Sequence, residues 1–281
     1  MIQFAQQHHS RLNVFISAQR KSIAETLYEI YLWRELVQFL VWRDLKVRYS
    51  QTYVGLAWIV IQPLVSLILF SGIFGKFMKI PSDGLPYPVF VVSGLVLWNF
   101  FANGMTNAAS SLVNNANLVT KSYFARLAIP IAAILSSLVD FLIALVFAVI
   151  VVRYFQTPLS PKMLIVIPLV GVTFLAACGA GFLLAAVNVI YRDVKHIVPF
   201  LAQAWFFASP VIYSTNLLPP GYRMVMALNP MAGVIEGMHW SLGTTNDPWP
   251  MIGIAALVSV ALFAIGILVF NRLEGRFADV V

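Results

Sequence analysis

Long stretches without charged side chains alternate with short charged segments along this chain of 281 residues. The charge-free runs cover 49–75, 84–120, 163–191, 196–222 and 248–271, and a run over 127–152 is interrupted only by Asp140. A helix needs about 20 apolar residues to cross the hydrocarbon core of a bilayer. Each run is long enough, so the pattern predicts membrane spans. We place six of them, at 54–75, 88–109, 129–152, 163–188, 197–213 and 250–271.

The composition supports this interpretation. Hydrophobic residues make up 60% of the chain and charged residues 10%, against about 25% charged residues in an ordinary soluble domain. A soluble helical protein could not hide so much apolar surface from water. The predicted fold class is therefore an all-α integral membrane protein. The fifth span contains Pro199 and Pro210, and lipid-buried backbone tolerates proline where neighbouring groups satisfy the freed carbonyls, so this span should lie against other helices.

Three segments organise the chain: an N-terminal segment 1–53, a membrane domain 54–271 and a short tail 272–281. Helical spacing in the first segment places five apolar residues on one face, as in a helix that lies in the membrane interface. These residues are Trp33, Leu36, Val37, Leu40 and Val41. We expect the stripe to break at Asp44 and the chain to enter the bilayer at about Tyr53.

The region 214–249 is too amphipathic and too rich in proline for a simple loop. It contains the turn sequence Pro219-Pro220-Gly221, then an apolar stretch that stops at Pro230, then a helix-like run with Glu236 in its middle. A pair of short re-entrant helices that dip into the outer leaflet fits this pattern. They could gate the outer mouth of a passage or simply cap the bundle.

Lysine and arginine are distributed unevenly between the two sides of this topology. With both termini in the cytoplasm, thirteen of the 18 Lys and Arg residues fall in cytoplasmic segments, as the positive-inside rule requires. The net charge of +7 is then explained by topology and contact with anionic membrane lipid, and no nucleic-acid partner is expected. We expect a multi-pass protein of the inner (plasma) membrane, and we see no cleavable signal peptide.

Candidate catalytic and metal-binding patterns are missing from the sequence. Cys178 is the single cysteine, so an intrachain disulfide is excluded. His196 and His239 have no histidine or cysteine partner at ligand spacing, so we expect no metal site. The absence of a catalytic triad or carboxylate pair argues against a membrane-embedded transferase. The segment SGIFGKF, with Gly75-Lys76, lacks the remaining residues of a P-loop, so we expect no ATP hydrolysis by this chain alone.

Four motifs and the C-terminal end of the chain carry a resemblance to a known family. They are WRDLKVRYSQTYVGLAWIVIQPL (42–64), NLVTKSYFARLAIP (117–130), NVIYRDVKHIVPFLAQAWFFASPVIYS (188–214), LNPMAGVIEGMHWSLG (228–243) and the tail FNRLEGRFADVV. In this order they resemble the permease subunits of type-2 ABC exporters that export polysaccharides. The resemblance covers nearly the whole chain from about Leu36 onward.

The resemblance implies an ATP-driven exporter in which this chain forms the channel. Two copies would face each other, with two copies of a separate ABC ATPase subunit beneath them. ATP and Mg would bind to that partner, and no cofactor would bind to this chain. The expected substrate is a lipid-linked polysaccharide, most simply O-antigen, with capsular polysaccharide and teichoic acid as alternatives.

Cytoplasmic segments of such a subunit must receive motion from the ATPase. By resemblance, the N-terminal helix and the loop 110–127 would be the principal contacts. We therefore predict as coupling residues Arg43, Asp44, Lys46, Arg48, Lys121 and Arg126. The alternative for the basic residues is ordinary snorkelling at the membrane shoulder. The family commonly has proline where this chain has Ala125, so the geometry of that loop is open.

A passage for sugars should offer aromatic platforms and hydrogen-bonding groups but few fixed charges. Spans one and five fit this description, and the family's channel is likewise attributed to them. The candidate channel residues are Tyr53, Trp58, Gln62, Gln203, Trp205, Phe206, Phe207 and Tyr213. The alternative for Tyr53, Trp58 and Tyr213 is a place in the aromatic belt at the headgroups.

Asp140 is the one acidic residue within a predicted span, and intramembrane ionisable groups are costly and usually paired or functional. A proton-coupled secondary transporter would use it as the coupling site. Such carriers usually have repeated halves, and we find no internal repeat. We therefore favour a hydrogen-bonding role for Asp140 within the bundle or at a dimer contact.

Overall fold

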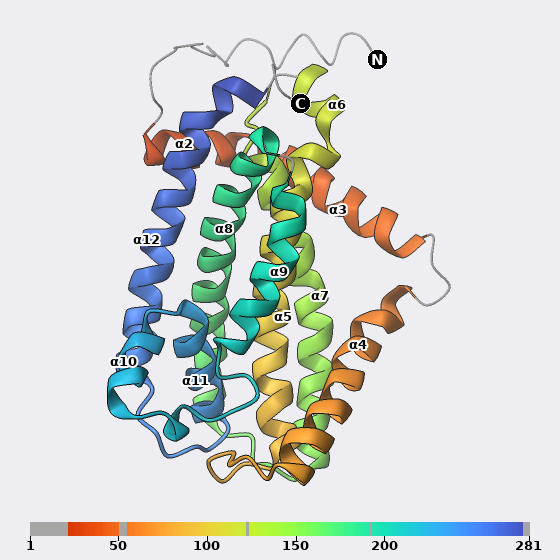
Figure 1. The fold of residues 1–281 in the computed structure, drawn as a ribbon. Coiled ribbons are helices and arrows are strands. Elements are labelled where there is room, and N and C mark those ends of the chain that lie inside the picture. The colour runs from red at the N-terminus through yellow and green to blue at the C-terminus, as the bar shows by residue number, and fades with distance from the viewer. Residues whose placement is uncertain (1–21, 51–54, 122–123, 192, 278–281) are drawn as a thin grey trace.

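The computed structural model describes residues 22–50, 55–121, 124–191 and 193–277, and within these ranges the regular structure is entirely helical. The elements in chain order are α2 (Ile23–Leu32), α3 (Arg34–Ser50), α4 (Gly55–Phe70), η2 (Ser71–Phe77), α5 (Tyr87–Asn114), α6 (Ala116–Lys121), α7 (Ala128–Tyr154), η3 (Pro161–Ile165), α8 (Val166–Ile190), α9 (Val194–Phe207), η4 (Thr215–Leu217), α10 (Pro220–Ala227), α11 (Pro230–Ser241), α12 (Trp249–Leu273) and η5 (Glu274–Arg276). Figure 1 shows the long helices side by side in one bundle.

Five stretches of the described chain are long and apolar enough to cross a membrane. They are Ala57–Phe77, Tyr87–Asn114, Ala128–Tyr154, Pro161–Ile190 and Trp249–Arg276. These stretches coincide with five of the six spans that the charge-free runs predict. The all-helical membrane architecture is thus confirmed.

The predicted span 197–213 is not one continuous helix in the structure, so the count of six spans stays a prediction. Helix α9 has 14 residues and ends at Phe207, which gives about 21 Å at 1.5 Å per residue, short of the roughly 30 Å hydrocarbon core. The chain turns directly after it, where Pro210 has no N–H to donate and disfavours helix at the residue before it. The charge-free run 196–222 continues through this turn and so conceals it.

Helix α5 forms the centre of the bundle. In its most apolar stretch, 78% of the residues are buried, against 11% in the corresponding stretch of the first span. It packs on α7 and α8, and α8 packs on α12. The contact between α8 and α12 depends on glycine: a Cβ on Gly179 would lie 2.5 Å from the backbone of Leu262 and Phe263, and one on Gly266 would lie 2.4 Å from the carbonyl oxygen of Gly179. Small residues at such contacts let helix backbones approach closely.

The chain must return through the bundle between α8 and α12. Helix α8 ends at the same end of the bundle as α2 and α6, whereas α12 begins at the opposite end, near α10 and α11 (Figure 1). Helix α9 covers the first part of this return, and the two short helices α10 and α11 occupy the region 214–249. At the other end, the Asn271 side-chain amide donates to the Thr26 hydroxyl over 2.8 Å, so α2 and the end of α12 lie together.

The predicted interface stripe packs against the bundle. Val37 and Leu40 are buried, and Trp33, Leu36 and Val41 pack against the same core. The helix does not stop at Asp44; α3 continues to Ser50 and packs along α7. Its last residues therefore reach the middle of α7, where they build the site described next.

Candidate functional site

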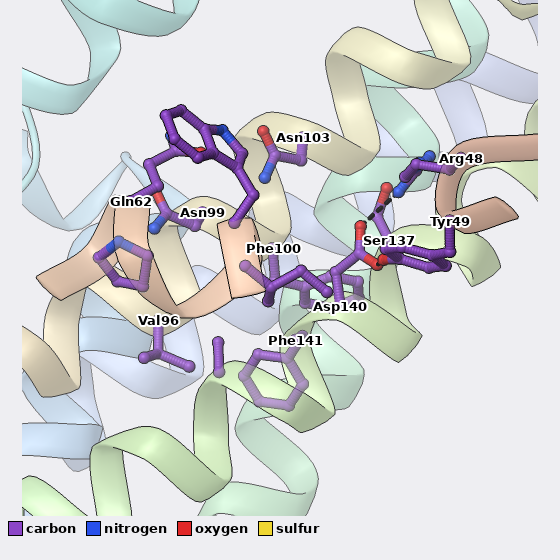
Figure 2. Close-up of a pocket in the computed structure, with 14 residues that line it drawn as sticks. Arg48, Tyr49, Gln62, Val96, Asn99, Phe100, Asn103, Ser137, Asp140 and Phe141 are labelled. Carbon is purple, nitrogen blue, oxygen red and sulfur yellow. Dashed lines mark hydrogen bonds and ion pairs between the residues drawn. The ribbon is translucent and has the colours of Figure 1, made fainter. Parts of the chain in front are cut away.

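A cavity of about 390 Å³ lies where the end of α3 meets α4, α5 and α7. Polar groups line it from all four helices, among apolar walls. The lining residues are Arg48, Tyr49, Trp58, Ile59, Gln62, Pro63, Val96, Asn99, Phe100, Asn103, Ser137, Asp140, Phe141 and Ala144. Figure 2 shows the charged cluster of Arg48, Tyr49 and Asp140 together, with Gln62, Asn99 and Asn103 on the other side of the cavity.

The charged wall of the cavity joins α3 to α7. At 1.5 Å per residue, Asp140 lies about 18 Å along α7 from Ala128. Its carboxylate forms an ion pair with Arg48 and accepts a hydrogen bond from the Tyr49 hydroxyl. Its side chain is 17% exposed. The acidic residue of the third span is thus paired within its own chain.

Tyr49 stays a hydrogen-bond donor at neutral pH. Burial, followed by the hydrogen bond to Asp140, raises the pKa of Tyr49 to about 12. The phenol therefore keeps its proton and continues to donate it to the carboxylate. Three side chains held in this way fix the end of α3 against α7.

A polar stripe on α5 forms the opposite wall. Asn99, Asn103 and Asn107 are four residues apart, so they lie on one face of the helix. Asn107 donates to the Ser137 hydroxyl of α7 over 3.0 Å, while Asn99 and Asn103 face the cavity. The sequence-based prediction missed these residues, although the spacing of the three amides inside the charge-free run 84–120 was a visible signal.

Two of the candidate channel residues line this cavity. Trp58 and Gln62 lie one turn apart on α4 and are both exposed. Tyr53 lies outside the described residues. Because Arg48 lines the same cavity, the structure brings together residues for which the sequence suggested two different roles, coupling and substrate passage.

The candidate residues on and after α9 divide into two groups. Gln203 and Phe207 are exposed. Trp205 and Phe206 turn into the bundle: the Trp205 indole N–H donates to the Asn229 side chain over 2.9 Å, and the Phe206 ring lies 5.6 Å from that of Trp98.

Tyr213 follows the turn after α9. It is half-buried, and its hydroxyl donates to the Phe207 carbonyl oxygen over 3.1 Å. This bond closes the turn onto the end of α9. The five candidates at 203–213 therefore do not form one continuous exposed surface.

The candidate coupling residues on α3 have local partners. Arg43 forms an ion pair with the neighbouring Asp44 at 2.7 Å, and the Lys46 ammonium lies 4.7 Å from the centre of the Trp42 ring. Both interactions are on the helix surface. Lys46 is exposed, whereas Arg43 and Asp44 are half-buried, as is Arg48, whose partner is Asp140 on α7.

The loop between α6 and α7 supplies the other two coupling candidates. Arg126 donates to the backbone carbonyl of Glu274 and so ties this loop to the end of α12. Lys121 ends α6, and its side chain lies outside the described residues. Phe124, next to Ala125, is buried, and its ring lies 6.4 Å from that of Trp33. This contact attaches the loop to the junction of α2 and α3.

A second polar cluster holds the opposite end of the molecule together. The Glu236 carboxylate on α11 accepts hydrogen bonds from the Thr215 hydroxyl at 3.1 Å and from the Asn246 amide at 2.9 Å. Burial, with a smaller effect of nearby Asp83, raises the pKa of Glu236. The cluster fastens the loops on both sides of α10 and α11 to α11 itself.

A match to a known protein family covers most of the helical bundle. The sequence profile described as ABC-2 type transporter matches residues 35–242, from the first turn of α3 to the end of α11. The chain belongs to the ABC-2 type transporter family. The match therefore includes every residue that lines the cavity.

Individual relatives extend the similarity over nearly the whole chain. The O-antigen export system permease protein RfbA of Myxococcus xanthus is 30% identical over 258 residues, which cover 89% of this chain and 97% of that protein. The protein of the same name from Klebsiella pneumoniae is 28% identical, with 88% and 95% covered. The polysialic acid transport protein KpsM of Escherichia coli is 22% identical, with 71% and 78% covered.

Proposed function

We propose that this ABC-2 family member is the membrane subunit of an exporter that moves a polysaccharide, most simply O-antigen, out of the cytoplasm. The observation that carries the proposal is the match to O-antigen export permeases along almost their full length. Capsular polysaccharide is the nearest alternative, because a polysialic acid transport protein is also similar. The exported chain would be attached to a lipid.

Energy would come from a separate ATPase subunit that binds ATP and Mg. The sequence has no P-loop motif, so motion has to enter through segments at the end of the bundle that carries α2, α3 and α6. The charges of Arg43, Asp44 and Lys46 would form part of this contact, together with Lys121. Arg48 would act inside the subunit, as the point where α3 is fixed to α7.

The topology would have six crossings, with the return segment that begins with α9 as the fifth and both termini in the cytoplasm. Three observations support it: the opposite positions of the end of α8 and the start of α12 (Figure 1), the hydrogen bond between Thr26 and Asn271, and the excess of Lys and Arg at that end. Helices α10 and α11 would then lie at the outer surface of the inner membrane.

A second copy would complete the channel. The first span buries 11% of its most apolar stretch, so α4 has most of its surface left for lipid or for a partner. One bundle of this size cannot surround a hydrated glycan, and homo-oligomers with closed two-fold symmetry are the commonest arrangement.

Deletion and complementation test the function. We expect a deletion strain to lose its surface polysaccharide and to recover it with this chain only when the ATPase subunit is also present. Charge reversals at Lys46 and Lys121 should weaken co-purification of the ATPase or uncouple transport, whereas the same change at Lys162, which lies over Trp240 near the opposite end, should not. Unchanged surface glycan in the deletion strain, or nucleotide turnover by the purified chain alone, would contradict the proposal.

The secondary-transporter alternative makes a different prediction for Asp140. A proton-coupled carrier would lose coupling to a pH gradient when this residue is neutralised. The ion pair with Arg48 favours a structural role, because it joins α3 to α7 within the subunit. Export that continues in the absence of ATP but stops when the gradient is collapsed would favour the carrier.

A further inference from the structure

We infer that the cavity between α4, α5 and α7 binds a sugar unit of the exported chain. This inference rests on the proposed function. It adds a defined contact site for the glycan on α4 and α5, separate from the candidate channel residues on α9. Its key residues are Trp58, Gln62, Asn99 and Asn103, all of which line the cavity.

The amide groups of the cavity need a partner. Among the described residues, none bonds to the side chains of Gln62, Asn99 or Asn103, although all three belong to helices that are long and apolar enough to cross a membrane. A polar group at membrane depth without a hydrogen bond is costly, because lipid tails cannot satisfy it. Water or a hydroxylated ligand would satisfy these three amides, whereas an acyl chain could not.

The chemistry of the wall matches a sugar ring. A carboxamide has two N–H donors and an oxygen acceptor, and sugar hydroxyls likewise both donate and accept. The Trp58 side chain is 60% exposed and offers an aromatic face for the apolar C–H side of the ring. The 390 Å³ volume lies within the usual range for small-molecule sites, about 300 to 1,000 Å³.

The charge balance favours a neutral sugar over an anion. The two charged groups in the wall, Arg48 and Asp140, neutralise each other in an ion pair. A bound sugar would also contact the end of α3, because Arg48 and Tyr49 belong to the same wall. Occupancy of the cavity and the position of α3 are thereby linked.

Photo-crosslinking in the cells that make the glycan tests this site with the natural substrate in place. Trp58 is replaced by p-benzoylphenylalanine, an aromatic exchange that suits an exposed position. Ile68, on a different face of the same helix and 62% exposed, is the matched control. Phe207, exposed on α9, reports on the remainder of the proposed passage. After irradiation, the purified chain is stained for carbohydrate and its mass is measured.

We expect a carbohydrate-positive ladder from position 58 at least fivefold stronger than from position 68. Four results would overturn the inference: a phospholipid adduct at 58, a crosslinked pair of chains at 58, equal carbohydrate labelling at 58 and 68, or no adduct at 58. Carbohydrate labelling at 207 without labelling at 58 would overturn the site but leave the export function intact. No carbohydrate at any position, combined with normal surface glycan in the deletion strain, would overturn the function itself.

Discussion

The ion pair between Arg48 and Asp140 allows a test by exchange of charges. We consider three variants: Asp140→Asn, Arg48→Asp, and the double variant in which Arg48→Asp is combined with Asp140→Arg. Each single change leaves one partner without its counter-ion beside an apolar wall. The double variant restores opposite charges at the same two positions on α3 and α7.

The expected magnitude follows from burial. Removal of one member of a fully buried pair costs about 3 to 5 kcal/mol, and exposed pairs contribute about 0 to 1 kcal/mol. The side chains here are 35% and 17% exposed, so we expect about 2 kcal/mol for Asp140→Asn, between the two limits. Arg48→Asp should cost more, because it places two carboxylates together. The double variant should recover about half of that loss.

The assay combines thermal denaturation of the purified complex with the number of ATP molecules hydrolysed per glycan exported. If the pair fixes α3 to α7 for coupling, Asp140→Asn should lower the melting temperature and raise the ATP consumed per glycan, and the charge exchange should correct both. Tyr49→Phe, which removes one hydrogen bond, is a milder control at about 1 kcal/mol. Full coupling in Asp140→Asn, or an exchange variant no better than Arg48→Asp, would refute the reasoning.

Three further predictions concern the bundle, the cavity and the outer end. Gly266→Ala should destabilise the protein by about 1 to 3 kcal/mol through overpacking, because the new Cβ would lie 2.4 Å from the backbone of Gly179. The control Gly171→Ala has open space around its Cβ and should not be destabilising. Thermal denaturation of the two variants compares them. Asn103→Leu should reduce glycan export several-fold at unchanged protein level, with partial recovery in Asn103→Gln. The raised pKa of Glu236 means that the folded state binds its proton more tightly than the unfolded state does, so stability should fall as pH rises from about 4.5 through the raised value. Glu236→Gln should flatten this dependence in melting curves recorded across pH, and an unchanged slope would contradict it.

The sequence was sufficient for those features that depend on local composition. A span needs a long run without charge, and five such runs became helices of the expected length. At 197–213 the sequence did not show where the helix ends, because the charge-free run 196–222 continues past the turn at Pro210. The interface stripe at Val37 and Leu40 was predicted for the same local reason, but the continuation of helix α3 to Ser50 was not.

The site depends on contacts that are distant in the sequence. Arg48 and Asp140 are separated by 92 residues, and no pattern along the chain pairs them. The family resemblance suggested a cytoplasmic partner for Arg48, and the cost of a charge within a span suggested a bundle contact for Asp140. The stripe of Asn99, Asn103 and Asn107 was different, because its four-residue spacing is a local signal that could have been recognised as a polar helix face.

The position of the ion pair gives α3 a role beyond that of an anchor at the membrane surface. Apolar contacts are non-directional, so they define the position of a helix along its neighbour less sharply than hydrogen bonds and ion pairs do. The paired charges and the Tyr49 hydroxyl are directional, so the end of α3 has one preferred position against Asp140. A displacement of α3 by a partner would therefore either carry α7 with it or break the pair. In both cases the cavity changes shape, because Arg48, Tyr49 and Asp140 form one of its walls.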